Sequence, residues 1–238
     1  DTGEGLVLID SLYGKWVPQL VNNIRSLGFA PSDIKYVINT HGHFDHAGGS
    51  AYFQKVHGAE IVMTTEDWGI ARAEPELPQF YMPKPAVDIV AKDADTITLG
   101  DNTFELFNTP GHTTGVLSIR YKVREGDKEY TAMTLGGVGL NFSGVERTQT
   151  YIQSYERLQS IQAGTSVSLP NHQAMGNVFA RRDLLAARQP GAINPFVNAD
   201  SYKQDLAKFV AGAKIKLEKE KAGTAPSSLD ALVNATTD

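Results

Sequence analysis

The sequence contains no cysteine among its 238 residues. This absence excludes disulfide bridges, thiolate nucleophiles and metal sites built on cysteine. No apolar run approaches the roughly 18–20 residues that a membrane-spanning helix requires, so we expect no membrane association. Charge of one sign is not concentrated either. The net charge is -5, and no cluster of Lys and Arg indicates a nucleic-acid surface, so nucleic acid is not an expected partner.

The composition that remains is that of an ordinary globular protein. Hydrophobic residues make up 41% and charged residues 21% of the chain, which excludes an intrinsically disordered protein. The length allows one large domain or two small ones. Because no repeat and no linker interrupts the pattern, we expect a single domain over residues 1–221. A polar tail rich in small residues is expected over 222–238.

The periodicity of apolar residues predicts an α/β fold. The expected strands are Gly5–Ile9, Ile34–Asn39, Glu60–Thr64, Thr96–Leu99, Thr103–Phe107, Val116–Val123, Tyr130–Leu135 and Ser166–Leu169. The expected helices are 16–27, Ser50–Gly58, Arg147–Gln162, Phe179–Arg188 and Asp200–Lys221. Four prolines between Pro75 and Pro85 predict a surface loop near the functional site.

The segment that follows the second strand carries the chemistry. It reads T-H-G-H-F-D-H-A-G-G over residues 40–49, and its metal-capable side chains are His41, His43, Asp45 and His46. Imidazole and carboxylate are ligands that zinc accepts when no thiolate is available. In an extended segment, His41 and His43 point to the same side. Four ligands within six residues are too many for one tetrahedral ion, so the motif predicts two ions that share one wall of a cleft.

Two further histidines stand at ends of predicted strands. His112 lies in the tight turn T-P-G-H-T, and His172 follows Pro170-Asn171. Strand ends of an α/β fold meet at one edge, where sites form, so both are candidate ligands. Each alone could equally be structural, and the cluster favours the ligand interpretation. His57, inside a predicted helix, is expected to be structural.

A glycine-rich segment, Leu135–Gly139, resembles a phosphate-binding loop only weakly. It lacks both the Lys-Ser/Thr of a P-loop and the glycine spacing of a dinucleotide-binding motif. The sequence therefore predicts close backbone packing beside the metal site, and not a nucleotide site.

The motifs H-G-H-F-D-H and T-P-G-H-T, together with the later His172, resemble the metallo-β-lactamase superfamily. The resemblance extends from Gly5 to about Val210. It implies an α/β fold of the four-layer αβ/βα sandwich type, with the metals at one edge of the sheets. That superfamily usually opens with a strand hairpin, and this chain begins at Asp1 in the place of its turn. The N-terminal hairpin is thus expected to be incomplete or built differently, and an exposed sheet edge could pair with a second copy of the chain.

Within that superfamily, many hydrolases carry a bridging Asp, and one lactamase subclass a Cys, at the strand end that corresponds to Met133–Val138. This chain has neither, and it most resembles the all-histidine third subclass of metallo-β-lactamases. The resemblance implies that His41, His43 and His112 hold one Zn²⁺ and that Asp45, His46 and His172 hold a second. The segment Asn171-His172-Gln173 departs from the subclass pattern at the last ligand, which bears on substrate contacts there.

The resemblance implies a zinc-dependent hydrolase that opens β-lactam rings through a zinc-bound hydroxide, and so confers antibiotic resistance from the periplasm or outside the cell. Asp45 would be the catalytic carboxylate, which orients the nucleophile. Asn141 and Ser143 are candidates for binding the substrate carboxylate. Two alternatives remain open. One is an ester or amide hydrolase of the same fold, such as an acyl-homoserine lactonase. The other is a metal-binding protein with little activity.

Overall fold

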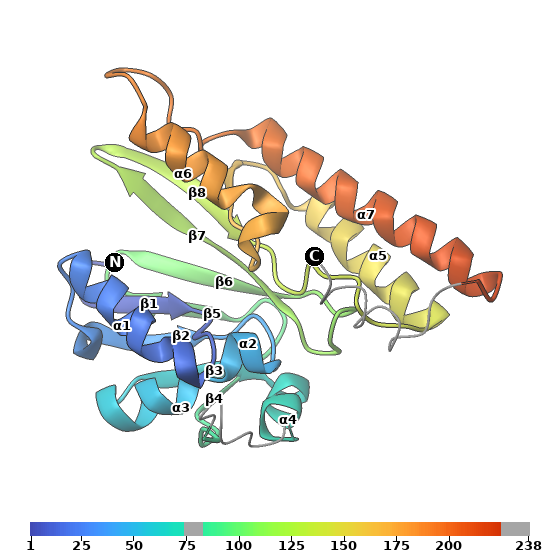
Figure 1. Cartoon of the computed structure of the whole chain (residues 1–238), viewed down its shortest axis with the longest axis horizontal. Helices are drawn as coiled ribbons and strands as arrows, with labels where there is room; N and C mark the ends of the chain where they lie inside the picture. The colour runs from blue at the N-terminus through green and yellow to red at the C-terminus, as the bar shows by residue number, and fades with distance from the viewer. Residues whose placement is uncertain (74–82, 225–238) are drawn as a thin grey trace. The chain divides into compact units, whose positions relative to one another are not determined.

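The computed structural model describes residues 1–73 and 83–224 (Figure 1). Two compact units account for these residues. The first comprises Asp1–Asn108 and Thr113–Tyr121, and the second comprises Thr109–His112 and the chain from Lys122 onward. The proline-rich loop predicted over 75–85 lies outside the described residues up to position 82, and 83–88 form no regular element. The predicted tail lies outside them from position 225. The prediction of a single domain over 1–221 stays a prediction.

The first unit is built on a parallel sheet whose strand order is β1-β2-β3-β4. Its strands are β1 (Leu6–Ile9), β2 (Ile34–Ile38), β3 (Glu60–Thr64) and β4 (Ile89–Ala91). Its helices are α1 (Val17–Ser26), α2 (Phe44–Ala47), α3 (Ser50–Tyr52), and α4 (Thr65–Ala73), and short 3-10 turns at Gly14–Trp16 and Pro31–Asp33 precede α1 and β2. A π-helical turn, Phe53–His57, follows α3 and ends at Gly58.

Both faces of this sheet are buried, as expected for parallel strands. On one face, Val37 and Met63 pack in a cluster with Val21 of α1. On the other face, Ile38 and Val62 pack against apolar side chains of two strands from the second sheet. Alternate residues of β2 and β3 thus serve opposite faces. The ends of these strands are thereby held in fixed register, and the ligand-rich segment starts from one of them.

The second sheet has the strand order β5-β6-β7-β8-β9. Its strands are β5 (Thr96–Leu99), β6 (Asn102–Asn108), β7 (Leu117–Glu125), β8 (Lys128–Thr134) and β9 (Thr165–Ser168). Strands β5 and β6, and β6 and β7, pair antiparallel, whereas β8 and β9 pair parallel. The parallel pair matters for the site, because its two carboxyl ends lie at the same edge.

The second unit contains α5 (Val145–Ser160), α6 (Val178–Ala186), α7 (Ala199–Lys221) and a short 3-10 turn at Gln173–Gly176. Helices α5 and α7 pack side by side (Figure 1). Aromatic rings fill their interface: Tyr151 stacks on Tyr155 with centroids 4.4 Å apart, and Tyr155 meets Phe209 of α7 edge-on. Helix α6, in contrast, buries no residue.

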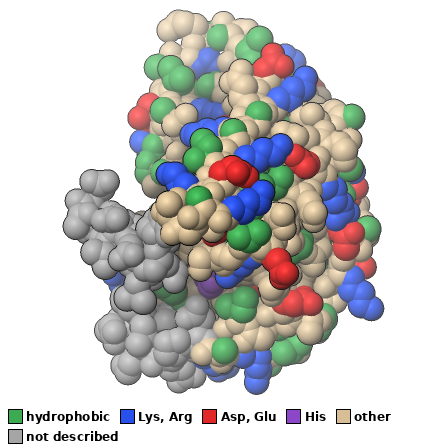
Figure 2. Space-filling view, turned by 90° about the vertical axis from the view of Figure 1, so that its right-hand side faces the viewer, with side chains coloured by type: hydrophobic (Ala, Val, Ile, Leu, Met, Phe, Trp, Pro, Cys, Tyr) green, Lys and Arg blue, Asp and Glu red, His purple; other side chains and the backbone are tan. Residues whose placement is uncertain are grey.

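Positive and negative side chains are mixed on the face drawn in Figure 2. Figure 2 shows Lys and Arg interspersed with Asp and Glu over the described part of that face, so no basic stripe runs across it. Among the described residues, no helix combines the length and apolar character needed to cross a bilayer.

Candidate metal centre

The ends of β1 and β2 place the first groups of the candidate centre. The two strands are parallel with Ile9 opposite Ile38, so Asp10 lies beside the start of the ligand-rich segment. One carboxylate oxygen of Asp10 accepts a hydrogen bond from the backbone N–H of Thr40 at 2.7 Å. The other accepts from the Thr40 hydroxyl at 2.9 Å. Asp10 therefore fixes the backbone immediately before His41.

The same carboxylate orients two histidine rings. Nδ1 of His46 donates to Asp10 Oδ2 at 2.7 Å. Nδ1 of His41 lies 3.1 Å from the Thr40 hydroxyl, which itself donates to Asp10. With Nδ1 engaged, Nε2 is the nitrogen of each ring that could serve as a ligand atom. Metal-binding histidines characteristically donate their other ring nitrogen in this way, so these residues fit a metal.

The remaining two candidates of the segment lie close by. Ring centroids of His41 and His43 are 4.8 Å apart, and those of His41 and His46 are 4.1 Å apart. Asp45 brings Oδ2 to 3.3 Å from Nε2 of His46, and its side chain is 34% exposed. The first unit thus brings together all four candidates of the motif, three imidazoles and one accessible carboxylate. This donor set suits a divalent ion such as zinc.

Buried hydroxyl and amide groups hold the ligand-rich segment in place through hydrogen bonds. The carbonyl of His46 accepts from the N–H of Ser11 at 2.7 Å and from its hydroxyl at 2.9 Å. The Ser11 hydroxyl also lies 3.0 Å from that of Ser50, to which Asn39 donates at 2.9 Å. Gly49 permits this closeness, since a Cβ there would lie 2.3 Å from the Ser11 carbonyl oxygen. The turn after β1 and helix α2 are thereby locked together.

His46 carries an unusual pKa in the metal-free protein. Burial lowers it, but the negative charges of Asp10 and Asp45 and their hydrogen bonds outweigh burial and raise the pKa of His46 to about 10. Near neutral pH this ring is protonated until a metal displaces its proton. Metal binding should therefore release a proton, as it does wherever a ligand must be deprotonated.

The metal-free protein should lose stability as the pH rises from about 6.5 towards 10. A histidine whose pKa is raised by folding stabilises the fold fully below its unfolded value, and that contribution disappears as the pH passes the folded value. The loss should be on the order of a few kcal/mol. Denaturant unfolding in chelator at several pH values measures it. His57→Gln is the control, because the pKa of His57 is lowered by burial and by Arg25. A flat profile between pH 7 and 10 would contradict the assignment.

In the second unit, helix α5 holds the turn that carries His112. Arg147 donates to the carbonyls of Gly111, at 2.7 Å, and His112, while Ser154 donates to that of Pro110 at 2.7 Å. Gly111 has a φ of +147°, and a Cβ there would lie 2.5 Å from Cβ of Tyr151. Three successive carbonyls and one glycine thus fix the turn against the helix.

The glycine-rich segment completes the surroundings of His112. Its carbonyls accept hydrogen bonds at Gly136 from Tyr155 (3.0 Å), at Val138 from Tyr151 (3.0 Å) and at Gly139 from Nδ1 of His112 (2.9 Å). In His112, too, Nε2 is the nitrogen that could serve as a ligand atom. The segment contributes backbone carbonyls and no ligand side chain, in agreement with the packing role predicted from sequence.

His172 follows β9 at the edge where β8 and β9 both end. Backbone N–H groups of Leu169 and Asn171 donate to the carbonyls of Met133 and Leu135, at 3.0 Å each, so the pairing continues past both strands. His172 is exposed and precedes a 3-10 turn that starts at Gln173. The predicted substrate residues Asn141 and Ser143 are also exposed. Their roles stay predictions.

Sequence reasoning missed the residues that hold the candidate ligands in place. Asp10 directly follows a predicted strand, so the strand-end rule that selected His112 and His172 could have selected it. Arg147 gave no such signal, because it lies in a helix, where charged residues are commonly solvated.

A family model described as the metallo-beta-lactamase superfamily matches residues 1–125, more than half of the chain. The chain belongs to the metallo-beta-lactamase superfamily. The matched residues include Asp10, the whole ligand-rich segment and His112, and they end before α5. The superfamily predicted from the motifs is confirmed.

Curated relatives match part of the chain. An N-acyl homoserine lactonase from Bacillus sp. is 32% identical over 101 residues, which cover 42% of this chain and 38% of that protein. A hydroxyacylglutathione hydrolase from Maricaulis maris (strain MCS10) is 37% identical over 82 residues, covering 34% and 27%. The chain thus spans well under half the length of both relatives.

Solved structures match over far more of the chain. The native FEZ-1 metallo-beta-lactamase from Legionella gormanii is 26% identical with a TM-score of 0.83, covering 93% of this chain and 88% of that one. BJP-1 of Bradyrhizobium japonicum, a subclass B3 metallo-beta-lactamase, is 26% identical with a TM-score of 0.80, covering 94% and 87%. These matches confirm the predicted metallo-β-lactamase fold, with two sheets and flanking helices.

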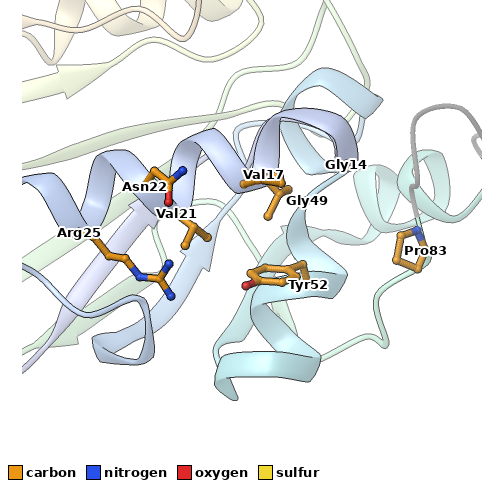
Figure 3. A pocket seen from close by; sticks show the side chains of 10 residues that line it. Gly14, Val17, Val21, Asn22, Arg25, Gly49, Tyr52 and Pro83 are labelled. Atoms are coloured by element: carbon orange, nitrogen blue, oxygen red, sulfur yellow. The ribbon is translucent and has the colours of Figure 1, made fainter.

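A cavity of about 310 Å³ lies elsewhere in the first unit, between α1 and the chain around Gly49 and Tyr52 (Figure 3). Val17 and Val21 line it from α1, and Arg25 stands at one end. Among its described lining residues there is no histidine, aspartate or glutamate. It therefore offers no metal ligand, and the candidate chemistry belongs to the histidine-rich segment.

Proposed function

We propose that the protein is a zinc-dependent hydrolase of β-lactams. The observation that carries the proposal is the likeness to subclass B3 metallo-beta-lactamases over more than nine tenths of the chain. The sequence adds support, because Met133–Val138 contains neither Asp nor Cys, the residues found there in other branches. The antibiotic-resistance role and a periplasmic or secreted location belong to the same proposal. Pairing with a second copy of the chain through a sheet edge remains a further proposal.

We propose that His41, His43 and His112 form one ligand set, and that Asp45, His46 and His172 form a second. Two Zn²⁺ ions bound there would lower the pKa of a coordinated water and polarise the carbonyl under attack. The chain's own residues do the rest. Asp10 and Gly139 engage Nδ1 of three of the rings, so Nε2 is the nitrogen that would bind a metal in each.

Asp45 is the group we assign to the attacking water. Its side chain is about one third exposed, so it can accept a hydrogen bond from water while it takes part in the second set. Asn141 and Ser143, both exposed after the glycine-rich segment, are proposed to bind the substrate carboxylate. Direct attack by water needs no covalent intermediate, and so no activated serine.

A second candidate function rests on a different observation. Relatives at 31–32% identity over 101 residues are N-acyl homoserine lactonases. Hydrolysis of a lactone, like that of a lactam, requires attack of water on a ring carbonyl. The proposed ligand sets alone therefore do not indicate which of the two substrates the protein hydrolyses.

A direct comparison of substrates tests the proposal. We expect hydrolysis of a chromogenic cephalosporin to exceed that of an acyl-homoserine lactone by at least about tenfold in kcat/KM, which corresponds to roughly 1.4 kcal/mol. Treatment with a chelator should abolish the activity, and added zinc should restore it. Faster turnover of the lactone would favour the second candidate. Stoichiometric zinc without turnover of either substrate would favour a metal-binding role.

A further inference from the structure

Helix α4 begins directly after β3 and buries a carboxylate in its first turn. Asp67 is only 1% exposed. Its backbone N–H donates to the Thr64 hydroxyl at 3.3 Å, and that hydroxyl donates to the carbonyl of Gly115 at 2.9 Å. A Cβ on Gly115 would lie 2.9 Å from Asp67 Oδ2, so backbone packs directly on the carboxylate.

Two ligand-bearing loops meet this carboxylate within the first unit. The Thr113 hydroxyl donates to Asp67 Oδ2 at 3.0 Å. The backbone N–H of Gly42 lowers the pKa of Asp67, which indicates that it faces the carboxylate. Gly42 lies against α4 so closely that a Cβ would be 2.3 Å from the carbonyl oxygen of Asp67 and 2.9 Å from the nitrogen of Ala71.

Gly42 and Thr113 are both direct neighbours of candidate ligands in the sequence. Gly42 separates His41 from His43, and Thr113 directly follows His112. We propose that Asp67 is a positioning residue for the first ligand set, which fixes the spacing between its two loops from beneath. This inference rests on the proposed function only through the identity of that ligand set.

The cost of the carboxylate argues against a purely structural role. Burial raises the pKa of Asp67 to about 6, and the nearby negative charge of Glu66 raises it further, even though the backbone N–H of Gly42 and the hydroxyl of Thr113 lower it. Folding therefore disfavours the ionised form, so this group weakens the fold as the pH rises from about 4 through 6. Strongly perturbed pKa values are common at functional sites, which agrees with the positioning role argued from the contacts.

The test compares Asp67→Asn and Thr113→Val with the control Glu66→Gln, which changes an exposed carboxylate on the same helix. Zinc affinity is measured by competition with a chromophoric chelator, and ligand geometry from the visible spectrum of the cobalt-substituted protein. For Asp67→Asn we expect the tighter zinc to bind about 10–100-fold more weakly with an altered cobalt spectrum, as for other supporting residues of metal sites. The metal-free protein at pH 7 should be at least as stable as the parent. Thr113→Val should shift affinity in the same direction by less.

Coupling between the two changes identifies the shared contact. The double variant should bind zinc no more weakly than Asp67→Asn alone, because both changes remove the same interaction. Zinc affinities equal to that of the parent in both variants would overturn the inference. So would a loss in Asp67→Asn that Glu66→Gln reproduces, or one explained by an equal loss of metal-free stability. Zinc binding is measured without substrate, so a parent protein that binds zinc but opens no lactam would refute the proposed function alone.

Discussion

Replacing His112 by alanine is expected to lower lactam hydrolysis on the order of 10³-fold and to reduce bound zinc from two ions per chain to one. His112 is the member of the first set that the second unit contributes, and its ring is fixed by the bond from Nδ1 to the Gly139 carbonyl. A Lewis-acid metal supplies several kcal/mol of stabilisation to a carbonyl under attack, and each 1.4 kcal/mol is tenfold in rate.

Metal content decides how the His112→Ala result is interpreted. It is measured on dialysed protein by elemental analysis, with kcat and KM determined in parallel. His57→Ala is the matched control: it removes a histidine from the π-helical turn and should leave both quantities unchanged. Two zinc ions per chain in the His112 variant would show that the ligand assignment is wrong.

The second large effect is expected from Asp10→Asn. Three donors converge on the Asp10 carboxylate: the N–H and hydroxyl of Thr40, and Nδ1 of His46. An asparagine keeps the shape but turns an NH₂ group towards one of these donors. We expect zinc affinity to fall about 10–100-fold. The metal-free protein should lose about 1.5–3 kcal/mol of stability, the usual contribution of a charge-assisted hydrogen bond.

A distinctive sign of the Asp10 effect is its dependence on pH. Because Asp10 is a main cause of the raised pKa of His46, the variant should lose most of the change in metal-free stability between pH 6.5 and 10. Unfolding in chelator at pH 6.5 and 9.5 measures this. Asp88→Asn is the control, since Asp88 accepts from the backbone N–H of Ile61 and from Gln54 and contacts no candidate ligand. Equal slopes in the parent and the Asp10 variant would contradict the role of Asp10.

Much of the fold could be predicted from apolar periodicity. Strand β3 has the predicted bounds, and β2, α5 and α7 differ from prediction by one or two residues at their ends. The elements that were missed are short or interrupted. Strand β4 has three residues, and α4 contains Gly69. The helix predicted over Ser50–Gly58 consists of a short α-helical segment followed by a π-helical turn. The spacing of apolar residues does not indicate where an α-helix changes to a π-helix.

In the candidate site, too, some residues could be predicted from the sequence and others could not. Its candidate ligands could be selected from the sequence because the spacing of histidines and aspartate is typical of metal sites. The groups that support them could not be, because their role exists only once strands and helices are packed. Thr113 and Asp67 are 46 residues apart in the chain, and nothing in either local sequence indicates that they share a hydrogen bond.

The contact pattern of Asp10 has a thermodynamic consequence. Its Oδ2 atom accepts from His46 directly and from His41 through the Thr40 hydroxyl, so one oxygen serves a residue from each proposed ligand set. Loading one set with metal would change the basicity of the histidine in the other by way of this shared acceptor. Such linkage is reciprocal, so the two ions would bind with interdependent affinities and not as independent equivalents.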